Sequence, residues 1–303
     1  MDLEKYNSIK QSVKDDLYVL ECSISDLFKN NTPLDKDLLN FLTAPAKRLR
    51  PLVGMLFLKC VFGKITPEQY DILLAVELIH NATLIHDDVI DEAQIRRKQE
   101  TINTKFDNNL AVIAGDLLLS IAMEKVVETN SFDIIKIFSS ALKSTCMGEI
   151  KQYFSKFQIT SIDEYIEKSK DKTALLFEIA VLSGLYLNNS SQDLKQTGSD
   201  FAQNFGIAFQ IRDDLINILY TETSPDINSG IYTAPAIFAY QENKNILNSE
   251  NILSEIKSSQ GIAKTKDLME NYFNKSISAI ETLENNIYKK AIIELIQLLK
   301  TNL

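Results

Sequence analysis

Two acidic motifs, far apart in the chain, carry residues that could bind a divalent cation. The first lies between Leu84 and Asp91 and contains Asp87, Asp88 and Asp91. Successive residues of a helix turn by about 100°, so Asp87 and Asp91 lie one turn apart on one face and Asp88 flanks them. Carboxylates this close repel one another unless a cation lies among them. Oxygen ligands without nearby cysteines or paired imidazoles favour Mg²⁺, which commonly completes its shell with water and substrate phosphates.

The second acidic motif lies between Gln210 and Asn217 and contains Asp213 and Asp214. Its last position, Asn217, would supply a neutral amide oxygen where a carboxylate would supply charge. Both motifs continue largely apolar segments that are expected to be buried, so the ordinary alternative, a solvated helix end, is the weaker one. Two such clusters predict a diphosphate held between facing helices.

Two short basic runs supply the complementary charge, at Lys47–Arg50 and at Arg96–Lys98. A guanidinium can donate two hydrogen bonds to a phosphate, so these runs predict direct contacts to a diphosphate beside the metal-mediated ones. Taken alone, each run would more often be a solvated basic loop or a helix end than a phosphate-binding site. Lys172 with Thr173, at the start of an apolar stretch, could similarly be an ordinary helix residue, and only the other motifs favour a functional role for it.

The chain has two histidines, His80 and His86, and their spacing of six is not that of a zinc-binding pair. His86 adjoins Asp87 and could be a hydrogen-bonding neighbour of the first motif. His80 could face a phosphate or be an imidazole of the core, and the residues alone leave both open. No glycine-rich loop or nucleophile elbow occurs, which argues against P-loop, dinucleotide and hydrolase chemistry.

The composition predicts an all-α protein. With only 9 glycines and 6 prolines in 303 residues, the chain lacks the turn residues that a β-rich fold needs. The net charge of −9 argues against nucleic acid as a partner. Three scattered cysteines, without close pairs, indicate neither a disulfide framework nor a zinc site, and they favour a reducing cytoplasm. No apolar run approaches the roughly 18 residues of a membrane span, and the first residues lack the features of a signal peptide, so we expect a cytoplasmic protein that does not span a membrane.

Helical periodicity covers most of the chain and shows no change of composition that would mark a domain boundary. We therefore expect a single domain over residues 1–303. Breaks are expected at residues 30–33, 63–67, 188–191 and 221–230. The predicted helical segments are 17–28, 38–42, 49–62, 72–90, 110–127, 132–154, 162–187, 201–219, 234–240, 262–283 and 287–299.

In their order along the chain, these motifs resemble those of the trans-isoprenyl diphosphate synthases, in the polyprenyl synthetase family. The resemblance extends from about Lys47 to Pro235. The matching motifs are Lys47-Arg48-Leu49-Arg50-Pro51, Glu77-Leu78-Ile79-His80, the first acidic motif with Arg96-Arg97, Gly115-Asp116, Gly148-Glu149 with Gln152, Lys172-Thr173-Ala174, and Phe209-Gln210 with Asp213-Asp214.

The resemblance implies an all-α single domain of antiparallel helices around a deep central cleft, the isoprenoid synthase type I fold, usually as a homodimer. It also implies about three Mg²⁺ ions gathered by the two acidic motifs. By this resemblance the metal ligands are Asp87, Asp88, Asp91, Asp213, Asp214 and Asn217. The residues that help to hold the allylic diphosphate are Arg96, Lys172, Thr173 and Gln210, and those that hold isopentenyl diphosphate are Lys47, Arg50, His80 and Arg97.

The implied reaction is a condensation of an allylic diphosphate with isopentenyl diphosphate. Metals and cations take up charge as the diphosphate leaves, and the double bond of isopentenyl diphosphate attacks the allylic carbon. Side chains on a helix tilt toward its N-terminus, so a growing product should pass Thr83 and Ala82, just before Asp87. Neither residue is aromatic, which predicts an open tunnel and a product of twenty carbons or more.

Several departures from the family pattern keep other functions open. Lys98-Gln99-Glu100 stands where the family has Gly-Lys-Pro, Ala46 replaces a glycine, and Ile231 replaces a lysine after Gly230. One alternative is therefore a non-catalytic or regulatory subunit of a heteromeric synthase. Another is ionisation without condensation, as in class I terpene cyclases, but a cyclase has no use for the residues assigned to isopentenyl diphosphate.

Overall fold

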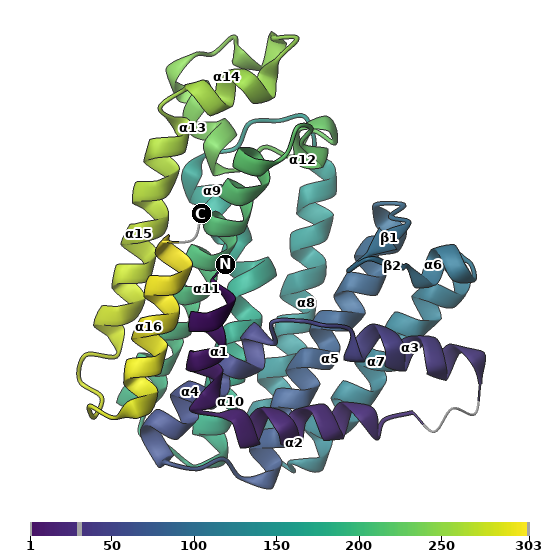
Figure 1. Cartoon of the computed structure of the whole chain (residues 1–303), viewed down its shortest axis with the longest axis vertical. Helices are drawn as coiled ribbons and strands as arrows, with labels where there is room; N and C mark the ends of the chain where they lie inside the picture. The colour runs from purple at the N-terminus through teal and green to yellow at the C-terminus, as the bar shows by residue number, and fades with distance from the viewer. Residues whose placement is uncertain (1, 29–31, 302–303) are drawn as a thin grey trace. The chain divides into compact units, whose positions relative to one another are not determined.

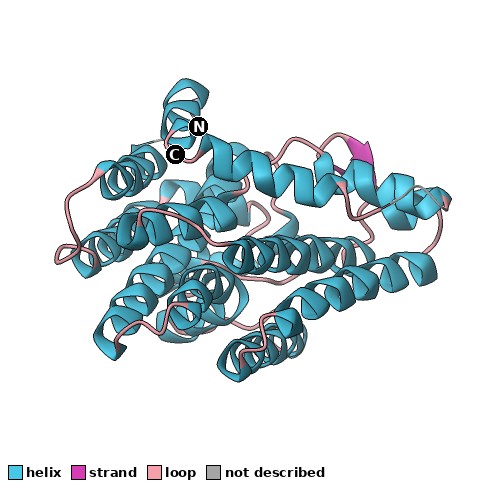
Figure 2. Ribbon diagram, turned by 90° about the horizontal axis from the view of Figure 1, so that it is seen from below, coloured by secondary structure: helices cyan, strands magenta, loops and turns pink. Residues whose placement is uncertain are grey.

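The computed structural model describes residues 2–28 and 32–301, and these residues are almost entirely helical (Figure 1), which confirms the all-α prediction. The only sheet in this part of the chain is a short antiparallel pair, coloured magenta in Figure 2. The elements are α1 (Leu3–Gln11), α2 (Lys14–Ser25), α3 (Pro33–Thr43), α4 (Leu49–Phe62), α5 (Pro67–Ile90), β1 (Ile95–Arg96), β2 (Gln99–Glu100), α6 (Ile102–Lys105), α7 (Asn108–Glu128), α8 (Phe132–Phe154), α9 (Ile162–Ser169), a π-helical turn η1 (Lys170–Ala174), α10 (Leu175–Leu187), α11 (Gln192–Tyr220), α12 (Pro225–Asn228), α13 (Ala234–Glu242), a 3₁₀ turn η2 (Ile246–Asn248), α14 (Ile252–Ser258), α15 (Gly261–Ala279) and α16 (Ile287–Thr301).

Several predicted boundaries were wrong. The segment predicted as one helix over 162–187 is divided by the π-helical turn, and the break predicted over 221–230 contains α12. The helix predicted over 262–283 ends at Ala279, and the one predicted over 17–28 ends at Ser25. Part of the break predicted over 30–33 lies outside the described residues. Helices α1, α6 and α14 and the β1–β2 pair were not predicted, because segments of two to nine residues are too short to show a period.

The described residues form two compact units. The first unit comprises those of Lys10–Phe138 and Ile179–Ser190, and the second unit comprises those of Met1–Ile9, Ser139–Glu178 and Ser191–Leu303. Helices α8 and α10 each contribute residues to both units. The expectation of a single domain stays a prediction.

In the first unit, α5 is the element that carries the first acidic motif. Its start is defined by a capping box, in which the Thr66 hydroxyl accepts from the Gln69 backbone N–H and the Gln69 side chain accepts from the Thr66 N–H, with Pro67 at the first helical position. Along α5, the apolar residues from Ile72 to Ile85 are buried except Leu84, which is half-buried, and the helix packs along α7. The acidic end of α5 is thus the continuation of a helix that the core holds over its length.

The beginning of α4 is held by a buried arginine. Arg48 is 4% exposed and forms ion pairs with Glu21 (2.8 Å) and Glu77 (2.9 Å), and it also donates to the carbonyl of Leu42. Arg48 adopts a left-handed backbone conformation with φ of 50°. Since a buried charge is tolerated only when it is paired, this network fixes the chain between Lys47 and Arg50.

In the second unit, α11 carries the second acidic motif and packs along α15 (Figure 1). Ser191 caps its start by accepting from the Leu194 N–H. Four aromatic rings, Phe177, Phe201, Phe205 and Phe273, are fully buried around this helix, with neighbouring centroids 5.1 to 6.0 Å apart. These contacts hold the middle of α11, from which the motif follows.

The π-helical turn η1 lies against α11 at a glycine. A Cβ placed on Gly206 would come within 2.3 Å of the Ala174 Cα, so only glycine permits this approach. Short π-helical turns often occur at functional sites. Here the turn contains Lys172 and Thr173.

None of the helices in the described ranges is sufficiently long and apolar to serve as a membrane span.

Candidate functional site

The first acidic motif lies at the end of α5, and its three carboxylates differ in exposure. The Asp91 N–H donates to the Asp87 carbonyl at 2.8 Å, so these residues are one turn apart, as predicted. Asp91 is exposed, Asp87 is half-buried, and Asp88 is only 2% exposed. The motif therefore presents two of its carboxylates more openly than the third.

Asp88 of α5 is held by Arg96, which lies eight residues later in β1. The Arg96 Nε donates to Asp88 Oδ1 at 2.6 Å. Burial raises the pKa of the Asp88 carboxyl above its usual range, against the opposing effect of the Arg96 guanidinium. Arg96 was predicted to contact a diphosphate, and in the structure it also neutralises a buried carboxylate of the motif.

His80 lies about two turns before Asp87 on the same side of α5, and it is surrounded by arginines. Burial, Arg50, Arg97, Arg96 and Arg48, in this order, lower the pKa of His80 well below its usual 6.5. The imidazole is therefore neutral in a strongly positive neighbourhood. The structure thus brings together three of the four residues that the sequence assigned to isopentenyl diphosphate.

Arg97 and Lys47 differ in how they are held. The Arg97 guanidinium lies 5.7 Å from the centroid of the Phe41 ring and donates to the Asn81 side chain at 3.5 Å. Lys47 is exposed at the start of α4. Arg97 is thus positioned by a cation–π contact from another element, and Lys47 remains at the solvent side.

The turn between β1 and β2 departs from what the sequence favours. Arg97 and Lys98 adopt positive φ values of 51° and 64°. A two-residue hairpin turn with both residues at positive φ normally takes glycine or asparagine. Lys98 occupies this strained conformation at the position where the family pattern suggested glycine.

His86 contacts α7 rather than its neighbour in the motif. Its Nε2 lies 3.2 Å from the Val112 carbonyl oxygen and 3.5 Å from Asp116 Oδ1. A Cβ on Gly115 would come within 2.2 Å of this ring nitrogen. The Gly115-Asp116 motif is therefore explained by a close packing of the His86 ring on α7.

The second acidic motif has one buried and one more open carboxylate. Asp214 is 5% exposed and accepts from the Tyr165 hydroxyl at 2.6 Å and from the Gln210 amide at 2.8 Å. Burial raises the pKa of Asp214 to about 7, against the opposing effect of these two hydrogen bonds. Asp213 is 42% exposed in its side chain and lies 3.3 Å from the Arg212 guanidinium. Asn217 is exposed, and its backbone carbonyl accepts from the Thr221 hydroxyl.

The π-helical turn brings Lys172 and Thr173 to this motif. Thr173 donates to the Gln210 side chain, and Lys172 forms an ion pair with Glu149 on α8 at 2.6 Å. The predicted group of Lys172, Thr173, Gln210 and Asp214 is therefore brought together within the second unit.

The donor chemistry of both motifs fits Mg²⁺, because carboxylate oxygens are its preferred protein ligands. Asp87, Asp91 and Asp213 present such oxygens at least partly to solvent. In the part of the chain that the structure describes, no three His, Cys, Asp or Glu side chains form a group that could hold a metal ion by themselves. The metal-ligand roles therefore stay predictions, including that of Asn217. The first acidic motif belongs to the first unit, and the second acidic motif belongs to the second unit.

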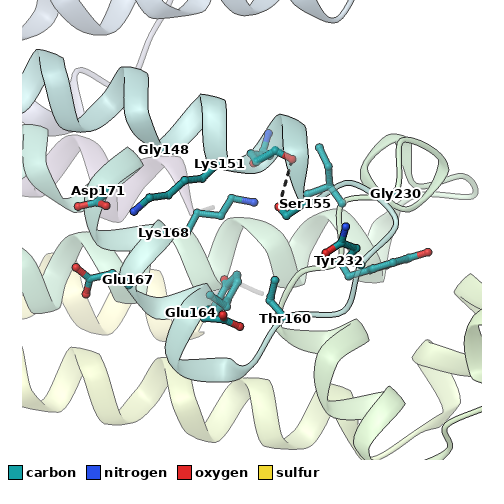
Figure 3. Close-up of a pocket in the computed structure, with 14 residues that line it drawn as sticks. Gly148, Lys151, Ser155, Thr160, Glu164, Glu167, Lys168, Asp171, Gly230 and Tyr232 are labelled. Atoms are coloured by element: carbon teal, nitrogen blue, oxygen red, sulfur yellow. Dashed lines mark hydrogen bonds between the residues drawn. The ribbon is translucent and has the colours of Figure 1, made fainter.

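Sequence reasoning missed Tyr165 and Lys168, which lie on α9 next to the second motif. Tyr165 reaches Asp214 across 49 positions of sequence, and a tyrosine on a helix gives no signal of such a contact. Both residues also line a cavity of about 370 Å³ in the second unit, together with Gly148 of α8 and the segment Gly230–Tyr232 (Figure 3). Cys146, an exposed free cysteine, lies two residues before Gly148.

Comparisons with known proteins identify the family. Residues 32–273 match the family model described as polyprenyl synthetase. A protein named prenyl transferase from Cyanidium caldarium is 32% identical over 306 residues, which cover 94% of this chain and 95% of that protein. The chain therefore belongs to the polyprenyl synthetase family, and it is a trans-prenyltransferase of this family.

Other relatives carry more specific names. The decaprenyl-diphosphate synthase of Dictyostelium discoideum is 32% identical over 84% of this chain and 59% of that protein. Component 2 of the heptaprenyl diphosphate synthase of Bacillus subtilis (strain 168) is 29% identical over 92% of this chain and 86% of that protein.

Solved structures confirm the fold. The heptaprenyl diphosphate synthase from Staphylococcus aureus superposes with a TM-score of 0.90 at 25% identity, covering 95% of this chain and 98% of that one. A polyprenyl synthase from Caulobacter crescentus CB15, complexed with calcium and isoprenyl diphosphate, gives a TM-score of 0.89 at 26% identity, covering 98% of both chains. The chain has the helical fold of the polyprenyl synthases, as the motifs implied.

Proposed function

We propose that this protein condenses isopentenyl diphosphate with an allylic diphosphate, head to tail and in the trans configuration, with Mg²⁺ as its cofactor. The observation that carries the proposal is in the first unit, where an acidic motif and an arginine-lined histidine share Arg96 and Arg97 as charged neighbours. The acidic motif suits metal ions that hold a first diphosphate, and the arginines around His80 suit a second diphosphate that is bound without metal. An enzyme that joins two diphosphates needs both.

The open carboxylates Asp87, Asp91 and Asp213 are proposed as the residues that bind metal ions. The buried Asp88 is held by Arg96, and the buried Asp214 is held by Tyr165 and Gln210. We propose that these two aspartates orient the motifs. When bound, Mg²⁺ would supply positive charge to the departing diphosphate. About three ions are proposed, as the family resemblance implies.

The second substrate is assigned to the cluster of basic residues around the neutral His80. Lys47, Arg50 and Arg97 would bind the isopentenyl diphosphate, and the N–H of the neutral His80 imidazole would donate a hydrogen bond to it. In the reaction, the bond between the allylic carbon and its diphosphate breaks, and the isopentenyl double bond attacks that carbon. One proton leaves, so the products are a longer allylic diphosphate, inorganic diphosphate and a proton.

The proposed product has twenty carbons or more. Ala82 and Thr83, just before the acidic motif, have small side chains and place no ring there. Ala82 is fully buried in α5, and the Thr83 hydroxyl donates to the His80 carbonyl at 2.8 Å. The names of the Dictyostelium discoideum and Staphylococcus aureus proteins, a decaprenyl and a heptaprenyl synthase, support this length.

A homodimer is proposed as the active form, and the cytoplasm as its location. The three cysteines form no disulfide with one another in the described structure, which suits a reducing compartment. The name of the Bacillus subtilis relative, which is one component of a synthase, supports a second candidate, a subunit that works only with a different partner chain.

The test is turnover by the purified protein alone. The protein is incubated with Mg²⁺, radiolabelled isopentenyl diphosphate and farnesyl or geranylgeranyl diphosphate, and the dephosphorylated products are separated by chromatography. A long product, lost by orders of magnitude in Asp91→Ala and retained in Asp193→Ala, would support the proposal. The second variant is the control, because Asp193 is exposed at the start of α11, outside the motifs.

Two other results would change the assignment. Binding of both diphosphates without any product would favour the subunit that needs a partner. If the protein binds neither diphosphate and makes no product, both candidate functions are contradicted.

A further inference from the structure

The cavity in the second unit is lined by Lys168, to which the proposed function assigns no role. It lies between α8, α9 and the segment Gly230–Tyr232, and Figure 3 shows the Lys168 side chain extending into it from α9 toward Ser155. Lys168 is half-buried. No hydrogen bond or ion pair joins its ammonium to another group of the described chain, so its positive charge is only partly hydrated and has no direct counter-ion.

The second lysine of the cavity differs in this respect. Lys151 points toward Asp171 in Figure 3, and its charge acts on the Asp171 carboxyl. The neighbouring Lys172 is paired with Glu149. Lys168 is thus the cation of this group whose charge is left to be matched by a bound anion.

The end of the cavity that Lys168 reaches carries the Ser155 hydroxyl, and the wall below it carries Thr160 and, beside it, the carboxylate of Glu164 (Figure 3). The Ser155 hydroxyl donates to the Gln152 carbonyl at 3.3 Å and keeps its lone pairs, and Thr160 offers a second hydroxyl. Ile231 contributes an apolar side chain to the lining of the cavity. Hydroxyl donors beside an ammonium suit phosphate oxygens, which accept several hydrogen bonds at once. The acidic lining residues Glu167 and Asp171 appear together at the other end in Figure 3.

The cavity also adjoins the second acidic motif. Tyr165 lines it and donates to Asp214, and the charges felt by Lys168 include those of Lys172, Asp214 and Glu149. An anion bound at Lys168 would therefore lie close to Lys172, which the family resemblance assigns to the allylic diphosphate, and to Asp214 of the second acidic motif.

We propose that Lys168 binds the diphosphate of the allylic substrate from α9, and that it supplies a positive charge in a cavity to which Ile231 contributes only an apolar side chain. The inference rests on the proposed function. It makes Lys168 a substrate-binding residue of this particular chain.

The test replaces the ammonium but keeps the length of the side chain. Lys168→Met should raise the KM for farnesyl diphosphate by about ten- to a hundred-fold, as expected for a lost hydrogen bond between charged groups. The KM for isopentenyl diphosphate should change by less than about two-fold. Lys170→Met is the matched control, because Lys170 is also half-buried and basic but does not line the cavity.

A second variant moves the positive charge from position 168 to position 231, which also lines the cavity. Ile231→Lys in the Lys168→Met background should restore most of the lost affinity, whereas Ile231→Lys in the native chain should change the KM little. Such rescue also shows that Lys168→Met folds. An unchanged KM for farnesyl diphosphate in Lys168→Met, with native turnover in the control, would overturn the inference.

Calorimetric titration with inorganic pyrophosphate and Mg²⁺ separates this inference from the proposed function. If the native protein makes no product but binds pyrophosphate, and Lys168→Met binds it at least about ten-fold more weakly, the proposed function fails and the anion site stands. If the native chain is active and both proteins bind pyrophosphate equally, the inference fails and the proposed function stands.

Discussion

At the scale of single residues, each acidic motif combines a carboxylate held by the protein with others left more open. Asp88 is held by Arg96 and Asp214 by Tyr165, whereas Asp91 is exposed. The sequence predicted the acidic residues and their helical spacing but not this division. The reason is that each partner comes from another element, which residue spacing along one helix does not reveal.

His80 should make the stability of the folded protein depend on pH below about 6.5. Its pKa is lowered in the folded state, so the unfolded chain takes up a proton at 6.5 that the folded chain does not. The stability that neutral His80 contributes is therefore present above this pH and lost as the pH falls below it. The loss approaches about 1.4 kcal/mol per pH unit.

The measurement is urea unfolding without metal or substrate at about pH 7.5 and about pH 5.5. His80→Gln should lose about 1 kcal/mol less than the native protein between these values. The contribution of His80 should persist in His86→Gln, which is the control. Equal losses in the native protein and in His80→Gln would contradict the prediction.

Ala82→Phe should shorten the product. Because side chains tilt toward the N-terminus of a helix, a ring at position 82 would lie about one turn before Asp87, where we expect the product to pass. Chromatography of the dephosphorylated products gives the chain length. Ala82 is fully buried, so a ring can also strain the core, and Thr83→Phe, at a half-buried position, is the companion variant. An unchanged product distribution in both, with native helicity, would contradict the tunnel.

At the scale of elements, the helices with clear ends were predicted well. The bounds expected for 49–62 and 132–154 agree with α4 and α8. The π-helical turn η1 could not be predicted, because its five residues, Lys170–Ala174, lie between two helical segments and include no glycine or proline that would mark a break. The β1–β2 pair was missed because its turn uses Lys98 at a φ of 64°, where a turn signal would be glycine.

Gly206→Ala should disturb the allylic side of the site through the π-helical turn. Its new Cβ would lie 2.3 Å from the Ala174 Cα, so the turn or α11 must move. We expect a loss of about 1–3 kcal/mol in unfolding free energy. We also expect a higher KM for farnesyl diphosphate, because Lys172 and Thr173 lie in that turn.

The control for this variant is Gly148→Ala, whose Cβ would meet nothing nearer than 3.9 Å. It should not lower the free energy of unfolding, since alanine is the better helix former. Native stability and KM in Gly206→Ala would show that the close approach to Ala174 is not required.

At the scale of the whole molecule, composition alone predicted the all-α class, and the ordered motifs predicted the family. Neither predicted that the described residues divide into two compact units, because the segments of each unit are interleaved along the chain. Hydrophobic periodicity reports which residues are buried but not which other segment buries them.

We expect the two units to unfold together. Helices α8 and α10 each contribute to both units, so unfolding of one removes part of the helices that the other needs. The chain has no tryptophan, so Phe62→Trp and Tyr240→Trp each provide a single reporter, one in each unit. Their urea transitions, monitored by fluorescence, should have the same midpoint. Separate midpoints would contradict the single domain.

The exposed thiol of Cys146 gives this protein a natural attachment point for a spectroscopic label. It lies two residues before Gly148, which lines the cavity that contains Lys168. Cys60 is buried and Cys22 half-buried, so a Cys22→Ser background leaves Cys146 as the accessible thiol of the described cysteines. Residues two apart on a helix point to nearly opposite faces, so a dye at this position would label α8 without filling the cavity, and its fluorescence would report a movement of α8 on ligand binding.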